Sequence, residues 1–502
     1  MVGYITHQRQ LNKHIMNNFN FISSKKSTMP RYHSVAVIGT GPSGVAAVKA
    51  LGDEKVFNTI RVFDRRDRVG GIWIYDPVPD VFPSSGKQQP QPRKIPAQLP
   101  QFTSPAPEDT TARTAAYDSL DSNVGAKAMA FTYKPFPIVN SPVSIERLGH
   151  GNPTRPLRTV AEYLEDIFQN YLHLASFNTS VERAEKRGDK WILTLRRSGQ
   201  VHHGKYLDYW WQENFDAVVI ASGHYNVPFI PSVSGLDQAA HAHPTKFEHS
   251  KSFRTQNDYV DKKVVVVGGN VSAADVVIDL HRIVKGPLYV SQRGTNEAFQ
   301  FAWDLPNVER QPALKEIHTT ETGISVTFAN GKTIDDVDKV IFGTGYRVSY
   351  PFLSPEPITP NNRVAGFYQH LFKTGDPSLA LVGQVRAGIS FRIYEYQAVA
   401  VARYFAGRNA KPLPSPQEQD LWEVERLKAK GPGTPFHEIK PDFKEYHDFA
   451  RELAGPPAPG TNGYELPPWD DRLAEQAFEI LQLREKYWKS VRAAYDVAKA
   501  RL

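Results

Sequence analysis

Two glycine-rich turns, each between a short apolar strand and a helix of small residues, are the features best suited to chemistry. The first follows the β-branched run 34–38 and leads into a helix over 45–51; it comprises Gly39, Thr40, Gly41, Pro42, Ser43 and Gly44. Glycine at this spacing permits a tight turn, close approach of the backbone to a pyrophosphate and close packing of helix on strand. The helix N-terminus then offers free N–H groups to the phosphates. We predict a dinucleotide site here.

Two features just after this turn strengthen the prediction. Asp64 ends the next strand, 60–63, where a carboxylate can accept hydrogen bonds from ribose hydroxyls. Gly70 and Gly71, followed by Ile72 and Trp73, would let the chain run close to a bulky ring system. The pattern alone leaves open whether Trp73 contacts a cofactor or is a core aromatic.

The second turn follows a four-valine run, 264–267, and opens a helix over 274–280; its motif residues are Gly268, Asn270, Ser272 and Ala273. Asn270 and Ala273 replace the second and third glycines of the usual pattern. Asparagine tolerates left-handed backbone angles and alanine has the smallest side chain, so we expect the turn to form.

The strand after this helix, 288–290, is followed by Ser291, Gln292 and Arg293 and carries no acid at the ribose position. A hydroxyl and a guanidinium there favour an extra phosphate, which predicts NADPH over NADH. The alternative for Arg293 is a solvated loop cation.

Length and composition limit the architecture that can hold these turns. A chain of 502 residues is expected to form two lobes with separate cores, and the alternation of strands and helices predicts the α/β class. Two apolar strands with small-residue ends, 218–223 and 340–345, would carry the chain between the lobes. No run of 18 apolar residues is present, so no membrane span is expected.

Charge and cysteine content exclude several classes of function. The net charge is +7, but residues 1–33 carry five basic residues and no acid, so the rest of the chain is nearly neutral and nucleic-acid binding is not expected. The chain has no cysteine, which excludes disulfides, thiolate metal sites and the redox pair of a disulfide reductase. The histidines at 241, 243 and 249 are interpreted as linker residues, and no metal site is predicted.

Three segments lie outside the two turns and the strands that carry them. Residues 1–33 are interpreted as a disordered or targeting tail, and we expect a cytoplasmic protein. Residues 77–107 hold nine prolines and five glutamines, too many for a regular element, and predict an insertion loop. After the Pro-rich stretch 411–470, with a helix starting near Ser415, a charged helix over 472–502 is expected to pack on a domain.

The ordered motifs resemble those of the flavin-containing monooxygenases, in their fungal branch. The similarity covers residues 34–408 and includes GTGPSG (39–44), VFDRRDRVGGIW (62–73), YDSLDSNV (117–124), ASGHYNVPFIP (221–231), VVVVGGNVSAAD (264–275) and FGTGY (342–346). The resemblance implies two Rossmann-like domains: a discontinuous FAD domain, 34–224 and 342–502, with an NADPH domain, 225–341, inserted into it.

The resemblance also implies a chemistry. NADPH reduces FAD, O2 adds to the flavin, and a nucleophilic substrate attacks the resulting hydroperoxide. Asn123 corresponds to the family asparagine that stabilises this intermediate, with Ser122 and Val124 beside it as cofactor contacts. Flavin performs the redox step, so no acid–base dyad is required. Oxygenation of nitrogen, in an alkaloid or another natural product, is preferred on family grounds, with sulfur next. No oligomeric state follows from the sequence, and a homo-oligomer is compatible with it.

Two alternatives stay open. A Baeyer–Villiger ketone oxygenase shares both nucleotide sites, but its signature between the domains usually ends in Trp, whereas here Phe253 and Arg254 end it. That segment matches the family only in part, because His243 and Thr245 replace an aromatic residue and a glycine, while His249 and Phe253 fit. A catalytically silent FAD- and NADP-binding redox sensor would keep the same motifs.

Overall fold

The computed structural model describes residues 31–83, 90–107, 109, 112–294, 296–386 and 389–501. The expected tail therefore lies outside the described residues up to position 30.

A seven-stranded sheet forms the first lobe and carries the first glycine turn. Its order is β19-β20-β21-β8-β1-β2-β4. The core of the sheet is parallel, because β1 pairs with both β2 and β8, and β8 also pairs with β21. β1 is almost wholly buried, as its continuous β-branched sequence predicts. The strands are β1 Ser34–Ile38, β2 Thr59–Phe63, β4 Ala175–Ser176, β8 Ala217–Ile220, β19 Phe367–Tyr368, β20 Phe372–Lys373 and β21 Leu379–Leu381.

Helices α2, α5 and α9 belong to this lobe, and their apolar residues form one core with β1 and β8. α2 and α9 make the most extensive helix pair of the structure. Their bounds are α2 Pro42–Asp53, α5 Leu157–Phe168 and α9 Ser390–Ala406, and the short α3 Ala126–Met129 and α4 Pro142–Leu148 lie between α2 and α5 in sequence.

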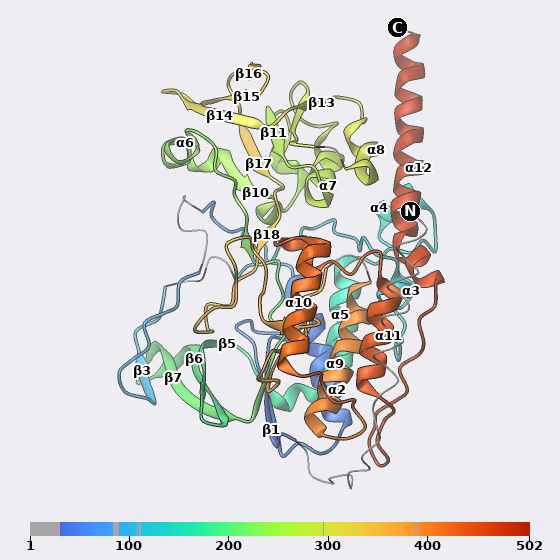
Figure 1. Ribbon diagram of the computed structural model, residues 1–502. Helices are drawn as coiled ribbons and strands as arrows, with labels where there is room; N and C mark the ends of the chain where they lie inside the picture. The colour runs from blue at the N-terminus through green and yellow to red at the C-terminus, as the bar shows by residue number, and fades with distance from the viewer. Residues whose placement is uncertain are drawn as a thin grey trace.

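A five-stranded parallel sheet, in the order β10-β17-β11-β12-β13, forms the second lobe. All of it lies between β8 and β21 in the chain, so the first sheet is built from two separated segments. In Figure 1 the green and yellow second lobe sits above a lobe that combines blue-green and orange-red segments. This arrangement confirms the α/β class with two nucleotide-binding sheets. The strands are β10 Phe247–His249, β11 Val264–Val267, β12 Leu288–Ser291, β13 Val308–Gln311 and β17 Lys339–Phe342.

The second lobe is completed by helices α6 Leu236–Ala242, α7 Val271–Leu280 and α8 Gln300–Trp303 and by a small sheet of β14 Leu314–Thr319, β15 Ile324–Phe328 and β16 Thr333–Ile334. Two short strands, β9 Val227–Pro228 and β18 Tyr346–Arg347, pair antiparallel where the chain passes between the lobes. The crossing points therefore lie side by side.

A four-stranded antiparallel sheet, β3-β7-β6-β5, corrects one prediction. The loop 77–107 was expected to hold no regular element, but β3 Gln101–Thr103 forms within it and pairs with β7. The stretch between Pro100 and Pro105 is free of proline, so its backbone can bond to the open edge of β7. The other strands are β5 Thr179–Arg187, β6 Lys190–His202 and β7 Lys205–Phe215.

The C-terminal part is helical: α10 Pro416–Lys430, α11 Phe443–Ala454 and α12 Arg472–Ala500. The predicted start of α10 is confirmed by a capping box between Ser415 and Glu418. α12 was expected to pack on a domain, and it packs on both lobes: Ala477 belongs to the core of the first, and Trp488 to the core of the second. Figure 1 shows α12 rising from the first lobe past the second. Within the described part of the chain, no helix is long and apolar enough to cross a membrane.

Candidate active site

One large cavity, about 1760 Å³, is lined by residues of both lobes and by both glycine turns. A pocket for a single small ligand usually measures on the order of 300–1,000 Å³. The cavity therefore has room for more than one ligand. All the predicted site residues line it except Gly44, Ser122 and Ala273.

The glycines of the first turn let neighbouring backbone segments pack closely against it. Gly39 has a φ of +106°, and a Cβ there would lie 2.6 Å from the carbonyl oxygen of Ala221. Gly71 faces Gly41 so closely that a Cβ on Gly71 would lie 2.7 Å from the Gly41 Cα. Gly44 lies behind the turn, where a Cβ would meet the Gly39 oxygen at 2.0 Å, so it serves helix packing and not ligand contact.

The start of α2 fits an anionic group. Its N-cap, Gly41, has no side chain to accept the first N–H groups of the helix, and Pro42 and Ser43 at its first positions line the cavity. Unsatisfied N–H groups and the positive end of the helix dipole bind phosphate. The turn therefore has the donors that a diphosphate requires.

Asp64 lines the cavity and also holds the turn together. Its carboxylate accepts hydrogen bonds from the backbone N–H of Thr40 at 2.7 Å, from the Thr40 hydroxyl at 2.6 Å and from the N–H of Arg66 at 2.8 Å. A carboxylate has about four acceptor sites. The three protein donors leave one acceptor site, and its use by a ribose hydroxyl stays a prediction.

Trp73 packs on an aromatic neighbour and also lines the cavity, and its contact with a cofactor stays a prediction. The residues Gly71–Trp73 form a 3₁₀ turn, and Ile72 and Trp73 line the cavity. The Trp73 ring also packs edge-on against Phe391, 6.1 Å between centroids. It can thus contact a ligand from a fixed position.

The second turn corrects the expectation for Asn270. Its backbone is extended, with φ −130°, and the left-handed angle belongs instead to Gly268. The Asn270 side chain caps α7 by accepting a hydrogen bond from the N–H of Val271 at 2.9 Å. Ala273 lies behind the turn, where a Cβ on Gly343 would come within 2.9 Å of its methyl group, while Ser272 lines the cavity. Asparagine is therefore suited to this position as a helix cap.

Ser291 and Arg293 have different surroundings. The buried Ser291 hydroxyl donates to the Pro312 carbonyl at 3.0 Å and accepts from the N–H of Leu314 at 2.8 Å. Arg293 is exposed and lines the cavity. Of the two predicted phosphate ligands, Arg293 has the freer side chain.

The segment around Asn123 meets α12. Asn123 is exposed into the cavity and Val124 lines it as well. Ser122 is turned away: its hydroxyl accepts from the N–H of Arg155 at 3.0 Å and donates to the Val124 carbonyl at 3.2 Å. The N–H of Gly125 then donates to the Ala477 carbonyl of α12 at 3.2 Å. Ser122 thus stabilises the loop that presents Asn123.

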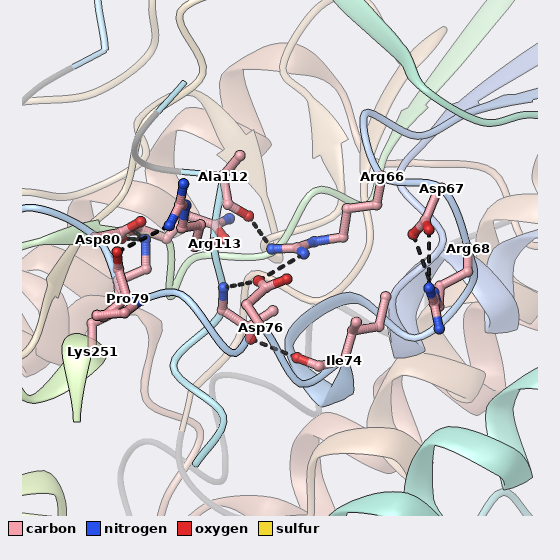
Figure 2. Close-up of polar contacts among 12 residues, drawn as sticks. Arg66, Asp67, Arg68, Ile74, Asp76, Pro79, Asp80, Ala112, Arg113 and Lys251 are labelled. Carbon is pink, nitrogen blue, oxygen red and sulfur yellow. Dashed lines mark hydrogen bonds and ion pairs between the residues drawn. The ribbon is translucent and has the colours of Figure 1, made fainter. Parts of the chain in front are cut away.

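A second set of contacts, separate from those of α12, joins the segment between the lobes to the loop that follows Trp73 (Figure 2). The Lys251 ammonium is fully buried and lies 2.5 Å from the Asp80 carboxylate. Burial lowers the pKa of Lys251 to about 8, although the Asp80 charge opposes this shift. Arg254, also buried, donates to the carbonyl of Asp76 at 2.6 Å and to that of Thr114 at 3.1 Å. The segment between the lobes is therefore fixed to the loop that follows Trp73.

That loop is in turn fixed to the first lobe. Arg66 lies 3.0 Å from the Asp76 carboxylate, as Figure 2 shows. The same carboxylate accepts a hydrogen bond from the N–H of Thr114 at 2.6 Å. The Thr114 hydroxyl donates to the Ile74 carbonyl at 2.5 Å.

His249, interpreted from the sequence as a linker residue, is buried in β10, and its Nδ1 accepts from the N–H of Lys251 at 3.1 Å. Among the described residues, no group of three His, Asp or Glu could hold a metal ion.

No role was predicted from the sequence for several residues that line the cavity. His224 and Tyr225 lie in a motif that was recognised, but no role was assigned to either. His224 is buried with both ring nitrogens unpartnered, and burial, together with the charge of Arg386, lowers its pKa to about 3. The His224 imidazole is therefore neutral near pH 7. Arg386, Tyr394 and the α12 residues Phe478 and Leu481 also line the cavity, and nothing in the local sequence marked them.

Comparisons with known proteins agree with this geometry. Residues 154–374 match the family described as pyridine nucleotide-disulphide oxidoreductase, and residues 297–455 match the flavin-binding monooxygenase-like family. The Arabidopsis thaliana flavin-containing monooxygenase FMO GS-OX-like 7 is 30% identical over 80% of this chain and 79% of its own length. FMO GS-OX5 from the same plant is 27% identical over 88% and 90%, respectively.

Solved structures share the fold. The S-allyl-L-cysteine S-oxygenase from Allium sativum superimposes with a TM-score of 0.68 and 25% identity, over 93% of this chain and 97% of that one. An open form of cyclohexanone monooxygenase gives a TM-score of 0.51 at 14% identity, over 84% and 98%. With the motifs, the cavity and these relatives together, the chain belongs to the flavin-containing monooxygenases, which use FAD and NADPH.

Proposed function

We propose that this monooxygenase transfers one oxygen atom of O2 to a nucleophilic nitrogen or sulfur atom of a small molecule. The observation that carries the proposal is that a single cavity contains both nucleotide-binding turns and the exposed Asn123. A reduced flavin, a nicotinamide and a substrate can therefore meet in one chamber.

The residues of the chain bind and orient, and the bound FAD supplies the oxygen chemistry. The N-terminus of α2 is placed to hold the FAD diphosphate, and α7 with Arg293 to hold NADPH. The Asn123 amide can donate a hydrogen bond into the chamber. We expect apolar side chains of the same cavity to exclude water, and a dry site strengthens each polar contact. These side chains are Val124, Phe391, Phe478 and Leu481.

Sulfur is favoured over nitrogen by one observation. The Allium sativum structure, which superimposes with a TM-score of 0.68, is named an S-allyl-L-cysteine S-oxygenase. The preference for nitrogen, and for an alkaloid, rests on the family resemblance of the motifs alone. So does placement in the fungal branch, because the named relatives come from plants.

The two other functions have weaker support. The likeness to cyclohexanone monooxygenase, at 14% identity, concerns the fold only. Phe253 and Arg254 are both buried and used structurally, as a core ring and as a clamp between the lobes. A silent redox sensor would need no water-excluding wall beside Asn123.

A matched substrate panel tests the proposal. We would measure NADPH oxidation, O2 uptake, H2O2 release and oxygenated product with a thioether, a tertiary amine and a cyclic ketone of similar size. We expect sulfoxide or N-oxide formation at a rate close to NADPH consumption. Lactone as the main product would support the ketone oxygenase instead, and NADPH oxidation that yields only H2O2 with every compound would support the sensor.

A further inference from the structure

One part of the cavity wall carries charge that the protein leaves unpaired. Arg386 lies just beyond β21, and its backbone is fixed: its N–H donates to the His437 carbonyl at 2.9 Å, and its carbonyl accepts from the N–H of Ile439 at 3.3 Å. Its side chain lines the cavity, and Nε and one terminal nitrogen are buried without a partner. Among the described residues, no carboxylate forms an ion pair with it.

Two arginines that are more deeply buried than Arg386 have partners within the chain. Arg196 lies 2.6 Å from the Glu182 carboxylate and 2.8 Å from that of Asp208. Arg254 donates to four backbone carbonyls. A guanidinium is always charged, and burying such a charge without a partner is costly. The contrast indicates that the partner of Arg386 comes from outside the chain.

The surroundings of Arg386 describe that partner. Tyr225 and Tyr394 line the same wall, and the charge of Arg386 opposes the rise that burial causes in the pKa of each hydroxyl. Glu438 lies beside Arg386 in a backbone bridge and also lines the cavity. A cation and an anion next to each other, flanked by hydroxyls, are complementary to a zwitterion.

The phosphates of the two cofactors have other donors. The proposed function assigns the first glycine turn and the start of α2 to one diphosphate, and the second turn with Arg293 to the other. Arg386 belongs to neither turn: it follows β21 in the sequence, three residues after Gly383. Its fork of donors suits a planar carboxylate, which it can bind through two parallel hydrogen bonds.

We propose that Arg386 binds the carboxylate, and Glu438 the ammonium group, of an α-amino-acid substrate whose side-chain heteroatom is oxygenated. This proposal rests on the proposed heteroatom oxygenation and adds a substrate class to it. The amino-acid end of the substrate is held at this wall, so the side chain extends into the chamber that Asn123 shares.

Two thioethers that differ by one group test the proposal. S-methyl-L-cysteine has the carboxylate, and 2-(methylthio)ethylamine is the same molecule without it. In the wild-type holoenzyme we expect the amino acid to have the lower KM. Arg386→Gln should raise KM for S-methyl-L-cysteine about tenfold or more, because a charged hydrogen bond of this kind is lost. It should leave kcat, and both constants for 2-(methylthio)ethylamine, nearly unchanged.

Three further variants complete the design. Arg386→Lys should recover part of the affinity, because it restores the charge without the fork. Glu438→Gln should raise KM for S-methyl-L-cysteine but not for its N-acetyl derivative, which lacks the ammonium. Arg347→Gln is the matched control: this arginine also lines the cavity, but its guanidinium lies over the Phe229 ring at 5.1 Å, and we expect the ratio between the two thioethers to be unchanged.

Clear outcomes would overturn the proposal. If Arg386→Gln loses bound FAD, or weakens both thioethers equally, Arg386 serves the cofactor or the general structure. Equal KM values for the two thioethers in the wild type would likewise end it. If the wild type oxygenates neutral thioethers or amines but neither probe, heteroatom oxygenation stands and the amino-acid site falls. If it oxygenates no nitrogen or sulfur compound at all, both fall.

Discussion

Gly125 is the position where a single methyl group should disturb both the C-terminal helix and the active-site loop. It lies two residues after Asn123, and its N–H donates to Ala477 of α12. Its φ of −58° is one that alanine adopts without strain. A Cβ at this position, however, would lie 1.9 Å from the Gln476 carbonyl oxygen, which is backbone and cannot rotate away. The helix or the loop must therefore move in Gly125→Ala.

The magnitude follows from two opposing effects. Replacing glycine by alanine at a compatible backbone stabilises a protein by about 0.4–1 kcal/mol through the unfolded state. Overpacking costs typically about 1–3 kcal/mol. A net loss of about 1–2 kcal/mol is expected, which corresponds to a fall in Tm of roughly 1–2 °C for a chain of 502 residues. The displaced loop should also misplace the Asn123 amide, and misplacement by about 1 Å can cost on the order of 100-fold in rate.

The assay combines thermal melting with coupling, measured as H2O2 released per NADPH oxidised. Gly323→Ala is the control, because its Cβ would meet only the flexible end of Lys246 at 3.7 Å. We expect Gly125→Ala to melt lower and release more H2O2, and Gly323→Ala to do neither. Wild-type melting and coupling in Gly125→Ala would show that the contact with α12 does not fix the loop.

Three further predictions concern single side chains. Arg293→Ala should raise KM for NADPH about tenfold and change KM for NADH little, since a charged hydrogen bond to the extra phosphate is lost; equal effects on both would refute the phosphate role. Asn123→Ala should divert NADPH oxidation to H2O2 with less effect on its rate, and unchanged coupling would make Asn123 an ordinary loop amide. Burial would raise the pKa of Asp216, but bonds from Lys190 and the start of β1 outweigh it and lower the pKa to about 2. That stabilisation is present above the unfolded value of about 3.9 and is lost as the pH falls toward 2. Asp216→Asn should therefore cost about 1–2 kcal/mol at neutral pH and progressively less at acid pH in thermal melts, with the exposed Asp189→Asn as control; the same loss at both pH values would contradict this reasoning.

The nucleotide-binding elements could be predicted because local sequence determines them. The four-valine strand β11 has the predicted bounds, since a continuous apolar run suits a strand buried on both faces. Both helices begin three residues earlier than predicted, at Pro42 and Val271, because the motif residues themselves form the first helical turn. The order of strand, turn and helix was thus predicted correctly, while the helix limits were not.

The remaining parts depend on contacts that are distant in sequence. β3 exists only because β7 offers it an edge, and the Lys251–Asp80 pair joins residues 171 positions apart. Arg386, Phe478 and Leu481 reach the cavity through tertiary packing and follow no motif. Their roles could be assigned only after the two lobes and α12 were seen together.

The place of α12 in the chain has a consequence for how the protein is made. Arg484 on this helix lies 2.5 Å from Asp275 of α7, and Phe478 and Leu481 complete the cavity wall, yet all three follow every strand of both sheets in the sequence. Domains generally begin to fold during synthesis, N-terminal parts first. A nascent chain can therefore assemble both sheets while its reaction chamber is still open to water. Until α12 docks, the cavity lacks the part of its wall that Phe478 and Leu481 supply.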